Sequence, residues 1–153
     1  VWWPGRDYKT TPILLPMAHT YDSLNVGDTF ETVMTVSAAD VRAYADLTGD
    51  DNPIHVDAEY AATTDFGQPI AHGALLLGYI SKVLGRDYPG HGSVAVSLSA
   101  KFLRPVPVDS EVTIEVKIAE KIERFGHVKA KVYVYRGGKM ACGGEAVVIP
   151  PKE

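Results

Sequence analysis

Alternating apolar and polar residues dominate the second half of the chain. Three stretches repeat with a period of two, which is typical of strands that bury one face. Their apolar positions are Val94, Val96, Leu98, Ala100 and Phe102, then Val112, Ile114, Val116 and Ile118, then Val128, Ala130, Val132 and Val134. A last stretch, 140–149, follows Gly137-Gly138, a pair typical of a tight hairpin. Because the connections are too short for crossover helices, we expect these strands to pair antiparallel.

One earlier segment has almost no polar face. Between Gly73 and Leu84 most residues are apolar, and a helix of this kind is expected to be enclosed on most sides. A further strand is predicted at 29–36, where Thr, Val and Phe are frequent. Five strands and one buried helix predict the α+β class, with a five-stranded antiparallel sheet wrapped around one long central helix.

Length indicates a single domain. A chain of 153 residues is near the usual size of one domain and can bury a sizeable core. Residues 1–20 contain two tryptophans and three prolines without helical or strand periodicity. We therefore expect an irregular N-terminal arm over 1–20 and one domain over 21–153.

Charge and cysteine content exclude several functional classes. A net charge of -4 argues against nucleic acid or an anionic membrane as a partner. The apolar run 71–84 is interrupted by polar residues and is too short to span a bilayer. The only cysteine, Cys142, is expected to be a small buried hydrophobe. His19, His91 and His127 lack metal-ligand spacing, so we expect no metal site. A single cysteine also favours the cytoplasm as the compartment.

The candidate reactive residues lie between Gly49 and His55. Asp50 and His55 are five positions apart on a segment expected to be neither helix nor strand. Pro53 disfavours a helical conformation at Asn52, whose side chain can bond the backbone two residues on, so the chain should bend here. A bend would bring the carboxylate and the imidazole within one water molecule of each other, as acid/base catalysis requires. Asn52 is then a positioning residue.

Helix ends are predicted on both sides of this segment. Ser37 should cap a helix that Gly49 ends, and Asp57 should cap a short helix that reaches Ala62. Gly73, the first residue of the apolar helix, offers a free N–H without a side chain and can form an oxyanion site, although a glycine there is often only a helix start. The preceding His72 is expected to bond backbone near the helix start.

A family resemblance covers most of the chain. The segment from Tyr44 to His55, with Gly-Asp-Asp-Asn-Pro-Ile-His at its end, closely resembles the hydratase motif of the MaoC-like, R-specific enoyl-CoA hydratases, which have the hot-dog fold. The match continues at 56–61, 66–67, 70–73 and 102–106. Two positions depart from the family pattern. Ala74 stands where these enzymes often carry Met, and Val108 where a turn glycine usually precedes Asp109.

This resemblance implies a reaction and roles for residues. Asp50 and His55 would hold the water that adds to a trans-2-enoyl-CoA, giving (R)-3-hydroxyacyl-CoA without a cofactor, and Gly73 would bind the thioester oxygen. Which of the pair gives and which takes each proton stays open. Ala74 and Leu75 are expected to contact the acyl chain. We also expect a homodimer or a dimer of dimers, because a sheet around one helix leaves an edge that a second copy can pair.

Other functions fit parts of the pattern. A hot-dog thioesterase or an acyl-carrier-protein dehydratase of the type that keeps its acid on the central helix would need a carboxylate there, and 73–85 contains none. A non-catalytic module that binds acyl thioesters would not need both Asp50 and His55. Acyl length and the choice between CoA and carrier protein stay open. The basic residues available for CoA phosphates are Lys82, Arg86, Lys101 and Arg104.

Overall fold

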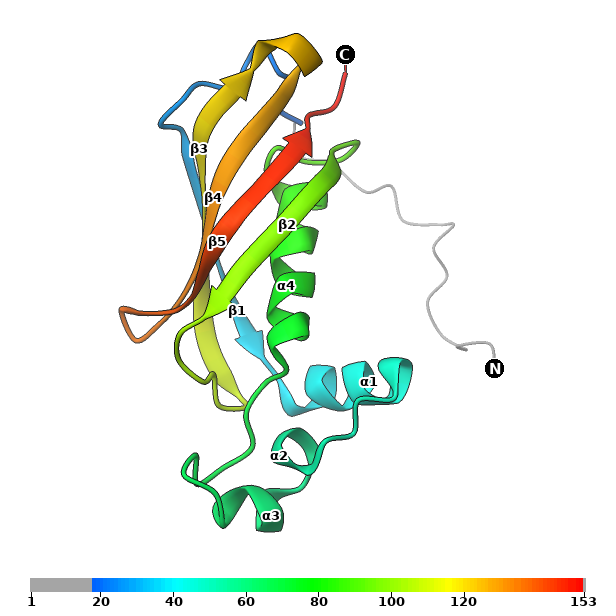
Figure 1. The fold of residues 1–153 in the computed structure, drawn as a ribbon, viewed down its shortest axis with the longest axis vertical. Coiled ribbons are helices and arrows are strands. Elements are labelled where there is room, and N and C mark those ends of the chain that lie inside the picture. The colour runs from blue at the N-terminus through cyan, green and yellow to red at the C-terminus, as the bar shows by residue number, and fades with distance from the viewer. Residues whose placement is uncertain (1–17, 153) are drawn as a thin grey trace.

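A computed structural model of the protein describes residues 18–152. It contains the five predicted strands, and of the four α-helices between the first and the second strand, α4 is the predicted central one (Figure 1). In chain order the elements are β1 (Thr29–Val36), α1 (Ala38–Thr48), α2 (Pro53–Val56), α3 (Ala58–Ala62), α4 (Gly73–Lys82), a π-helical turn (Val83–Asp87), β2 (Val94–Phe102), β3 (Ser110–Ile122), a 3-10 turn (Glu123–Phe125), β4 (His127–Arg136) and β5 (Lys139–Ile149).

The strands form one antiparallel sheet in the order β1-β3-β4-β5-β2. Strands β1 and β2 are therefore its two edges. The predicted hairpin joins β4 to β5, with Arg136 paired to Lys139. Gly137 and Gly138 have φ angles of 53° and 73°, the left-handed conformation that a two-residue hairpin turn needs at both central positions.

Helix α4 packs along one face of the curved sheet (Figure 1). The predicted inward positions of β3 and β4 are all buried, which confirms the alternation read from the sequence. On the helix side the core contains Leu76 and Ile80, and the turn that follows adds Val83 and Leu84. This sheet and helix are the hot-dog arrangement that the resemblance implied.

The predicted burial of α4 and β2 is only partly right. Ala74, Gly78 and Lys82 are exposed along α4, so the sheet covers one side of this helix and leaves the other open. On β2, Val94 and Phe102 are more than half exposed. The reason is topological, since β2 is an edge strand with a register shift between Ala95 and Ser97, and within the described residues no further strand covers it. The open sides of α4 and β2 therefore leave apolar surface accessible in a single chain.

The helix caps are those that the sequence predicted. The Ser37 hydroxyl accepts from the N–H of Asp40 at 3.1 Å, and Gly49 ends α1 with φ 79°. The N–H of Tyr60 donates to Asp57 at 2.9 Å at the start of α3.

A contact between helices fixes α1 against α4, because the Tyr79 hydroxyl donates to the Asp40 carboxylate at 3.0 Å. Burial, and next this carboxylate, raise the pKa of Tyr79 and keep it a donor.

The turn before β3 contains the Val108 departure from the family pattern. Its left-handed residue is Asp109, with φ 62°. Short polar residues tolerate this conformation because their side chains can hydrogen-bond locally. Here the Asp109 carboxylate accepts from the N–H of Ala38 at 2.9 Å, while its own N–H donates to the Val36 carbonyl at 2.8 Å. Asp109 therefore joins this turn to the start of α1.

Most of the predicted N-terminal arm lies outside the described residues, and the division at 20/21 stays a prediction. Residues 18–20 form no helix or strand, and the His19 N–H donates to the Pro89 carbonyl at 2.8 Å. Within the described part of the chain, no helix has the length and hydrophobicity needed to cross a bilayer. Cys142 is fully buried, as expected, and burial raises the pKa of its thiol.

Candidate active site

The segment that carries Asp50 and His55 bends as predicted, but it is not free of helix. Residues Pro53–Val56 form the single helical turn α2, which contradicts the expectation of neither helix nor strand. The reason is that proline is well tolerated at the first helical position, where its missing N–H would have no partner. Asn52 is the N-cap, and its side-chain oxygen accepts from the N–H of Ile54 at 3.4 Å. This cap positions His55 on the inner side of the bend.

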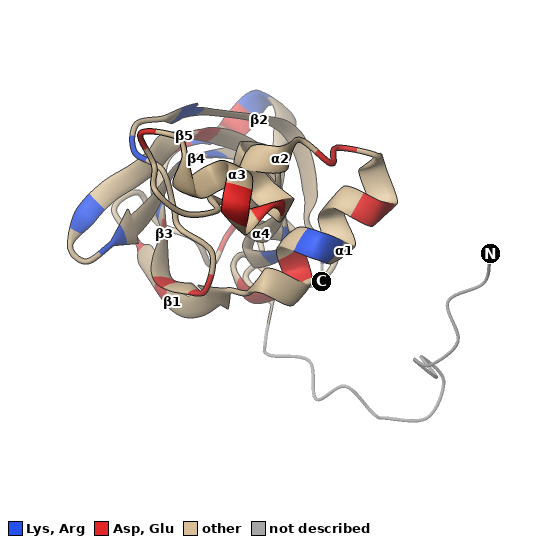
Figure 2. Ribbon diagram, turned by 90° about the horizontal axis from the view of Figure 1, so that it is seen from below, with Lys and Arg blue, Asp and Glu red and all other residues tan. Residues whose placement is uncertain are grey.

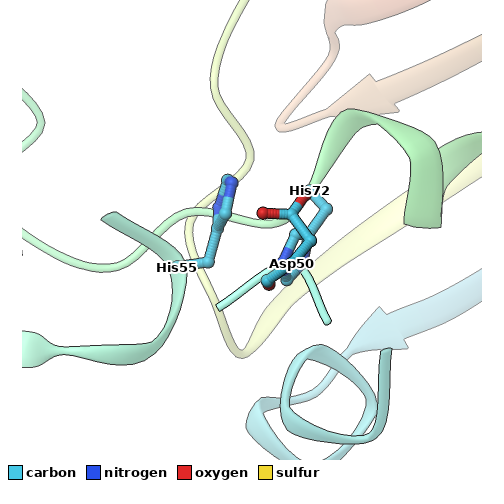
Figure 3. A group of neighbouring side chains, drawn as sticks. All are labelled: Asp50, His55 and His72. Carbon is cyan, nitrogen blue, oxygen red and sulfur yellow. The ribbon is translucent and has the colours of Figure 1, made fainter. Parts of the chain in front are cut away.

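Asp50 and His55 lie close together, as the sequence predicted. A carboxylate oxygen of Asp50 and a ring nitrogen of His55 are within 4.8 Å of each other. Figure 3 shows the Asp50 carboxylate turned towards the His55 ring. The two atoms make no direct hydrogen bond, and a single water molecule can bridge this distance with two ordinary hydrogen bonds. The pair can therefore hold one water between an anion and an imidazole.

A backbone contact fixes the tautomer of His55. Its Nδ1 lies 2.7 Å from the carbonyl oxygen of Ile70. A carbonyl only accepts, so Nδ1 carries the hydrogen and donates it. In the neutral ring Nε2 is then the acceptor. His55 is half-buried, and it lines the cavity described below. The ring is thereby arranged as a base whose free nitrogen is Nε2.

His72 has a larger part in this cluster than the sequence indicated. Its Nε2 donates to the carbonyl oxygen of Asp50 at 2.9 Å, across 22 positions of the chain, and its ring is stacked on His55 with centroids 3.9 Å apart. Only 2% of its surface is exposed. His72 does bond to backbone, as predicted. Its partner, however, is the carbonyl of Asp50 and not a group near the helix start. The one sequence signal for this role was the position of His72 directly before Gly73.

An apolar cavity opens beside these residues. It has a volume of about 310 Å³, at the lower end for small-molecule sites. Its lining comes from α2, from the segment between α3 and α4, from α4, and from the end of β2 with the loop that follows it. These residues are His55, Phe66, Ile70, Ala71, Gly73, Leu76, Phe102, Leu103, Arg104, Pro105 and Val106. The cavity offers a short acyl group an apolar wall with a base at one end.

Gly73 lies where its predicted role requires. It is the first residue of α4 and lines the same cavity as His55. The N–H of a first helical residue has no partner within the helix and lies at the positive end of the helix dipole. A side chain here would be obstructed, because an added Cβ would lie 2.8 Å from the ring of Phe102. The absence of a side chain therefore leaves room both for the Phe102 ring and for a ligand near the N–H.

Ala74 and Leu75 do not line this cavity. Ala74 is exposed and Leu75 is half-buried, and their contact with an acyl chain stays a prediction. On α4 the cavity is instead bounded by Gly73 and Leu76, which lie on the same helical face. Sequence reasoning did not select Leu76 or Phe102 as site residues. Phe102 began a stretch that resembles the family, and this was its only signal.

Asp50, His55 and His72 also form a group that could hold a metal ion by proximity alone. Their potential ligand atoms all lie within 4.8 Å of one another. The two rings are tilted by only 32° in their stack, so their in-plane lone pairs run side by side and do not converge on one point. Each ring also uses one nitrogen as a donor to a carbonyl oxygen. The arrangement therefore fits acid/base chemistry better than metal coordination.

The end of the molecule that carries this site is acidic. Residues 37–68 contain seven acidic side chains and a single basic one, Arg42. Figure 2 looks onto this end and shows red segments over α1–α3 and the loop between them. Next to the cavity the charge differs, because Arg104 is one of its lining residues and Lys101 is exposed on the same strand end. Polyanionic groups of a ligand would be accommodated better on the β2 side than beside α1.

Comparison with known proteins identifies the family. Residues 23–136 match the family described as MaoC like domain. The chain belongs to this family. An (R)-specific enoyl-CoA hydratase from Aeromonas caviae is 40% identical over 131 residues, which cover 84% of this chain and 97% of that protein. A 3-hydroxybutyryl-CoA dehydratase from Methylorubrum extorquens is 38% identical over 133 residues, which cover 87% and 85%.

Solved structures agree with this assignment to the MaoC-like family. An R-hydratase from Pseudomonas aeruginosa in its unliganded form superposes with a TM-score of 0.85 at 34% sequence identity. The superposition covers 89% of this chain and 88% of that chain. The resemblance read from the motif around Asp50 is therefore confirmed, and so is the hot-dog fold that it implied.

Proposed function

We propose that this protein is an (R)-specific enoyl-CoA hydratase, which adds water reversibly to trans-2-enoyl-CoA to give (R)-3-hydroxyacyl-CoA. The observation that carries the proposal is the pairing of the Asp50 carboxylate with His55 across the width of one water, beside a cavity that Gly73 also lines. Relatives named for this activity are similar over nearly their whole length. The stereochemistry of the product comes from those relatives.

In the proposed reaction the thioester carbonyl oxygen accepts a hydrogen bond from the Gly73 N–H, at the positive end of the α4 dipole. Electron density then moves from the double bond towards this oxygen, and the β-carbon becomes electrophilic. Nε2 of His55 takes a proton from the bridging water, whose oxygen bonds to C3. Asp50 accepts a hydrogen bond from the remaining O–H of that water, which stays on the oxygen and becomes the hydroxyl of the product. The proton held on His55 then passes to C2, so that one water is consumed and the enzyme is restored.

The tautomer of His55 supports this assignment of proton transfers. With Nδ1 donating to Ile70, only Nε2 can accept from water in the neutral ring. An aspartate is an anion near neutral pH and offers only acceptor atoms. His55 is therefore the group that both gains and returns the proton, and no metal or organic cofactor is needed in this scheme.

Coenzyme A is the proposed carrier of the acyl group. Its phosphates would approach from the side of β2, where Arg104 lines the cavity and Lys101 is near, because the α1–α3 end is acidic. Lys82 is less suitable, since its ammonium group is paired with Asp87 at 2.5 Å. An acyl-carrier-protein dehydratase or thioesterase of the type that keeps its acid on the central helix is not favoured, because α4 carries no carboxylate.

We also propose that the active form is a homodimer or a dimer of dimers, working in the cytoplasm in fatty acid metabolism. Strand β2 is an unpaired edge with exposed apolar residues, and the open side of α4 lies beside it. A second copy that paired along β2 would cover both surfaces. The single buried cysteine fits a reducing compartment.

The dimer is tested by measuring molar mass in solution by light scattering. Val96 is more than half exposed on β2, and Val96→Lys should weaken an interface built on this edge. The expected result is a dimer or tetramer for the wild type and a smaller species for Val96→Lys. A wild type that is monomeric at high concentration would contradict the proposed assembly.

The activity is tested with crotonyl-CoA and longer trans-2-enoyl-CoA homologues. Hydration removes the conjugated double bond, so the ultraviolet absorbance of the enoyl thioester should fall. Coupling to an R-specific or an S-specific 3-hydroxyacyl-CoA dehydrogenase identifies the product, and only the R-specific enzyme should reduce NAD. A stable absorbance at every chain length, or reduction of NAD with the S-specific enzyme, would reject the proposal.

A further inference from the structure

We propose that His72 is a positioning residue. It fixes the positions of the Asp50 and His55 side chains relative to the N–H of Gly73. This inference rests on the proposed hydratase function, and it assigns to His72 no direct part in proton transfer. Three features of the structure carry it: a hydrogen bond to the loop of Asp50, a stack on the ring of His55, and the adjacency of His72 to the oxyanion donor.

The hydrogen bond supplies the loop of Asp50 with an external anchor. Asp50 is exposed, and its own N–H reaches only the Thr48 hydroxyl, at 3.3 Å. The donor to its carbonyl is the buried Nε2 of His72, at 2.9 Å. Because a buried side chain with few rotamers has little freedom, this bond fixes the backbone from which the Asp50 carboxylate projects.

The ring of His55 is held by the same short segment. Its edge is fixed by the Ile70 carbonyl at 2.7 Å, and one of its faces lies against His72 with centroids 3.9 Å apart. Ile70, His72 and Gly73 are within four consecutive positions. One stretch of backbone therefore sets the position of the base, of the loop that carries the carboxylate and of the carbonyl-binding N–H.

His72 itself is unsuited to react with substrate. It is 2% exposed and does not line the cavity. Its Nε2 is used as a donor, and its Nδ1, also buried, contacts no hydrogen-bonding group within residues 18–152. A ring enclosed in this way cannot exchange protons with a ligand, so its effect on the reaction must pass through Asp50 and His55.

Three substitutions separate the two contacts. His72→Phe keeps a flat ring and removes the donor, His72→Gln keeps an N–H at similar reach and removes the ring, and His72→Ala removes both. We expect kcat for crotonyl-CoA to fall about tenfold in each of the first two variants and further in His72→Ala, because small misplacements of reacting groups are costly. KM should stay within about twofold. Ile80→Val, equally buried on α4 but distant from the loop, is the matched control and should leave kcat unchanged.

A double-mutant cycle distinguishes positioning from a general loss of structure. If His72 acts partly through His55, then His72→Ala should lower kcat by a clearly smaller factor in a His55→Ala background than in the wild type, because groups that act as a unit are not additive. The inference would be overturned if His72→Ala lowered kcat by the same factor in both backgrounds. It would also be overturned if the substitution changed only KM. Unfolding by urea is measured for each variant so that kcat refers to folded enzyme.

Nuclear magnetic resonance keeps the test separate from the proposed activity. Long-range nitrogen–proton spectra of the imidazoles report which nitrogen carries the hydrogen. In the wild type, His55 should be a single Nδ1–H tautomer, and in His72→Ala its ring signals should shift and broaden. An unchanged His55 spectrum would overturn the positioning role even in an active enzyme. A wild type that is inactive on enoyl-CoA, with the expected spectra, would reject the hydratase proposal and leave His72 as the anchor of the cluster.

Discussion

The two ends of helix α4 are held by different interactions, polar contacts at the start and apolar burial at the far end. At its start, His72 donates a hydrogen bond to the loop that carries Asp50, and Gly73 lines the cavity. At its far end, Ile80 and the following Val83 and Leu84 are almost wholly enclosed by apolar side chains. The same helix therefore serves the site through its first turn and the core through its later turns.

This division has an energetic side. A buried nitrogen without a hydrogen-bond partner, as Nδ1 of His72 is among residues 18–152, costs about 1–3 kcal/mol. Burial of a side chain such as Ile80 contributes about 1.5–3 kcal/mol, so the core end can offset the cost of the site end. Substitutions at the site end should therefore change turnover with little effect on stability, and substitutions at the core end should do the reverse.

The largest effect is expected at the reacting pair. Asp50→Asn or His55→Ala should lower kcat for crotonyl-CoA by about a hundredfold or more, the range for a positioned acid/base group. Thermal unfolding should stay close to that of the wild type, because Asp50 is exposed and His55 only half-buried. Asp51→Asn is the matched control, as this neighbouring carboxylate is also exposed and is not part of the group formed by Asp50, His55 and His72. Activity retained in both variants of the pair would refute their assignment.

The reverse pattern is expected at the core end. Ile80→Ala should lower the free energy of unfolding by about 2–3 kcal/mol, since it removes buried methylene groups and leaves a cavity. Urea denaturation measures this loss. The kcat of the folded fraction should be unchanged. A loss of turnover as large as the loss of stability would show that the two ends of α4 are not independent.

A smaller effect is expected at the boundary between site and helix. Gly73→Ala should lower kcat/KM about tenfold, because the new methyl group collides with the Phe102 ring at 2.8 Å and pushes it over the cavity. The fold should persist, since Phe102 is half exposed and its ring can move. Adding Phe102→Ala then separates two causes. If activity recovers in the double variant, the displaced Phe102 ring caused the loss. If it does not recover, the methyl group itself prevents the substrate from approaching the Gly73 N–H.

Local signals in the sequence were sufficient for much of the molecule. The bounds of β1, the caps Ser37 and Asp57, and the end of α1 at Gly49 all agree with the structure. These features depend on residues within a few positions of each other. The bend at Asn52 was predicted for the same reason, although the helical turn after it was not, because proline was read as a helix breaker and not as a first helical residue.

Features that depend on distant residues were missed. Apolar alternation indicates that a side chain favours burial, but it does not say whether the chain itself provides the cover, and so the exposure of β2 was not foreseen. The contact of His72 with Asp50 joins residues 22 positions apart, and the left-handed Asp109 is stabilised by its bond to Ala38. Neither contact has a local pattern. The motif located the reacting pair, while the supporting bonds required the folded structure.

The smallest effect, and the sharpest test of what completes the site, is expected at Ala74. If Ala74 contacts the acyl chain, as the sequence analysis expects, then Ala74→Met should favour shorter chains. In the structure, however, Ala74 is exposed and lies about 160° around α4 from Leu76, which lines the cavity. In a single chain the added side chain would reach solvent and leave the chain-length profile unchanged. If a second copy packs on the open side of α4, the side chain at position 74 would bound an acyl pocket between the two copies. The ratio of kcat/KM for hexenoyl-CoA to that for crotonyl-CoA should therefore fall a few-fold in Ala74→Met if the dimer builds the acyl pocket, and stay constant if the cavity of one chain holds the whole acyl group.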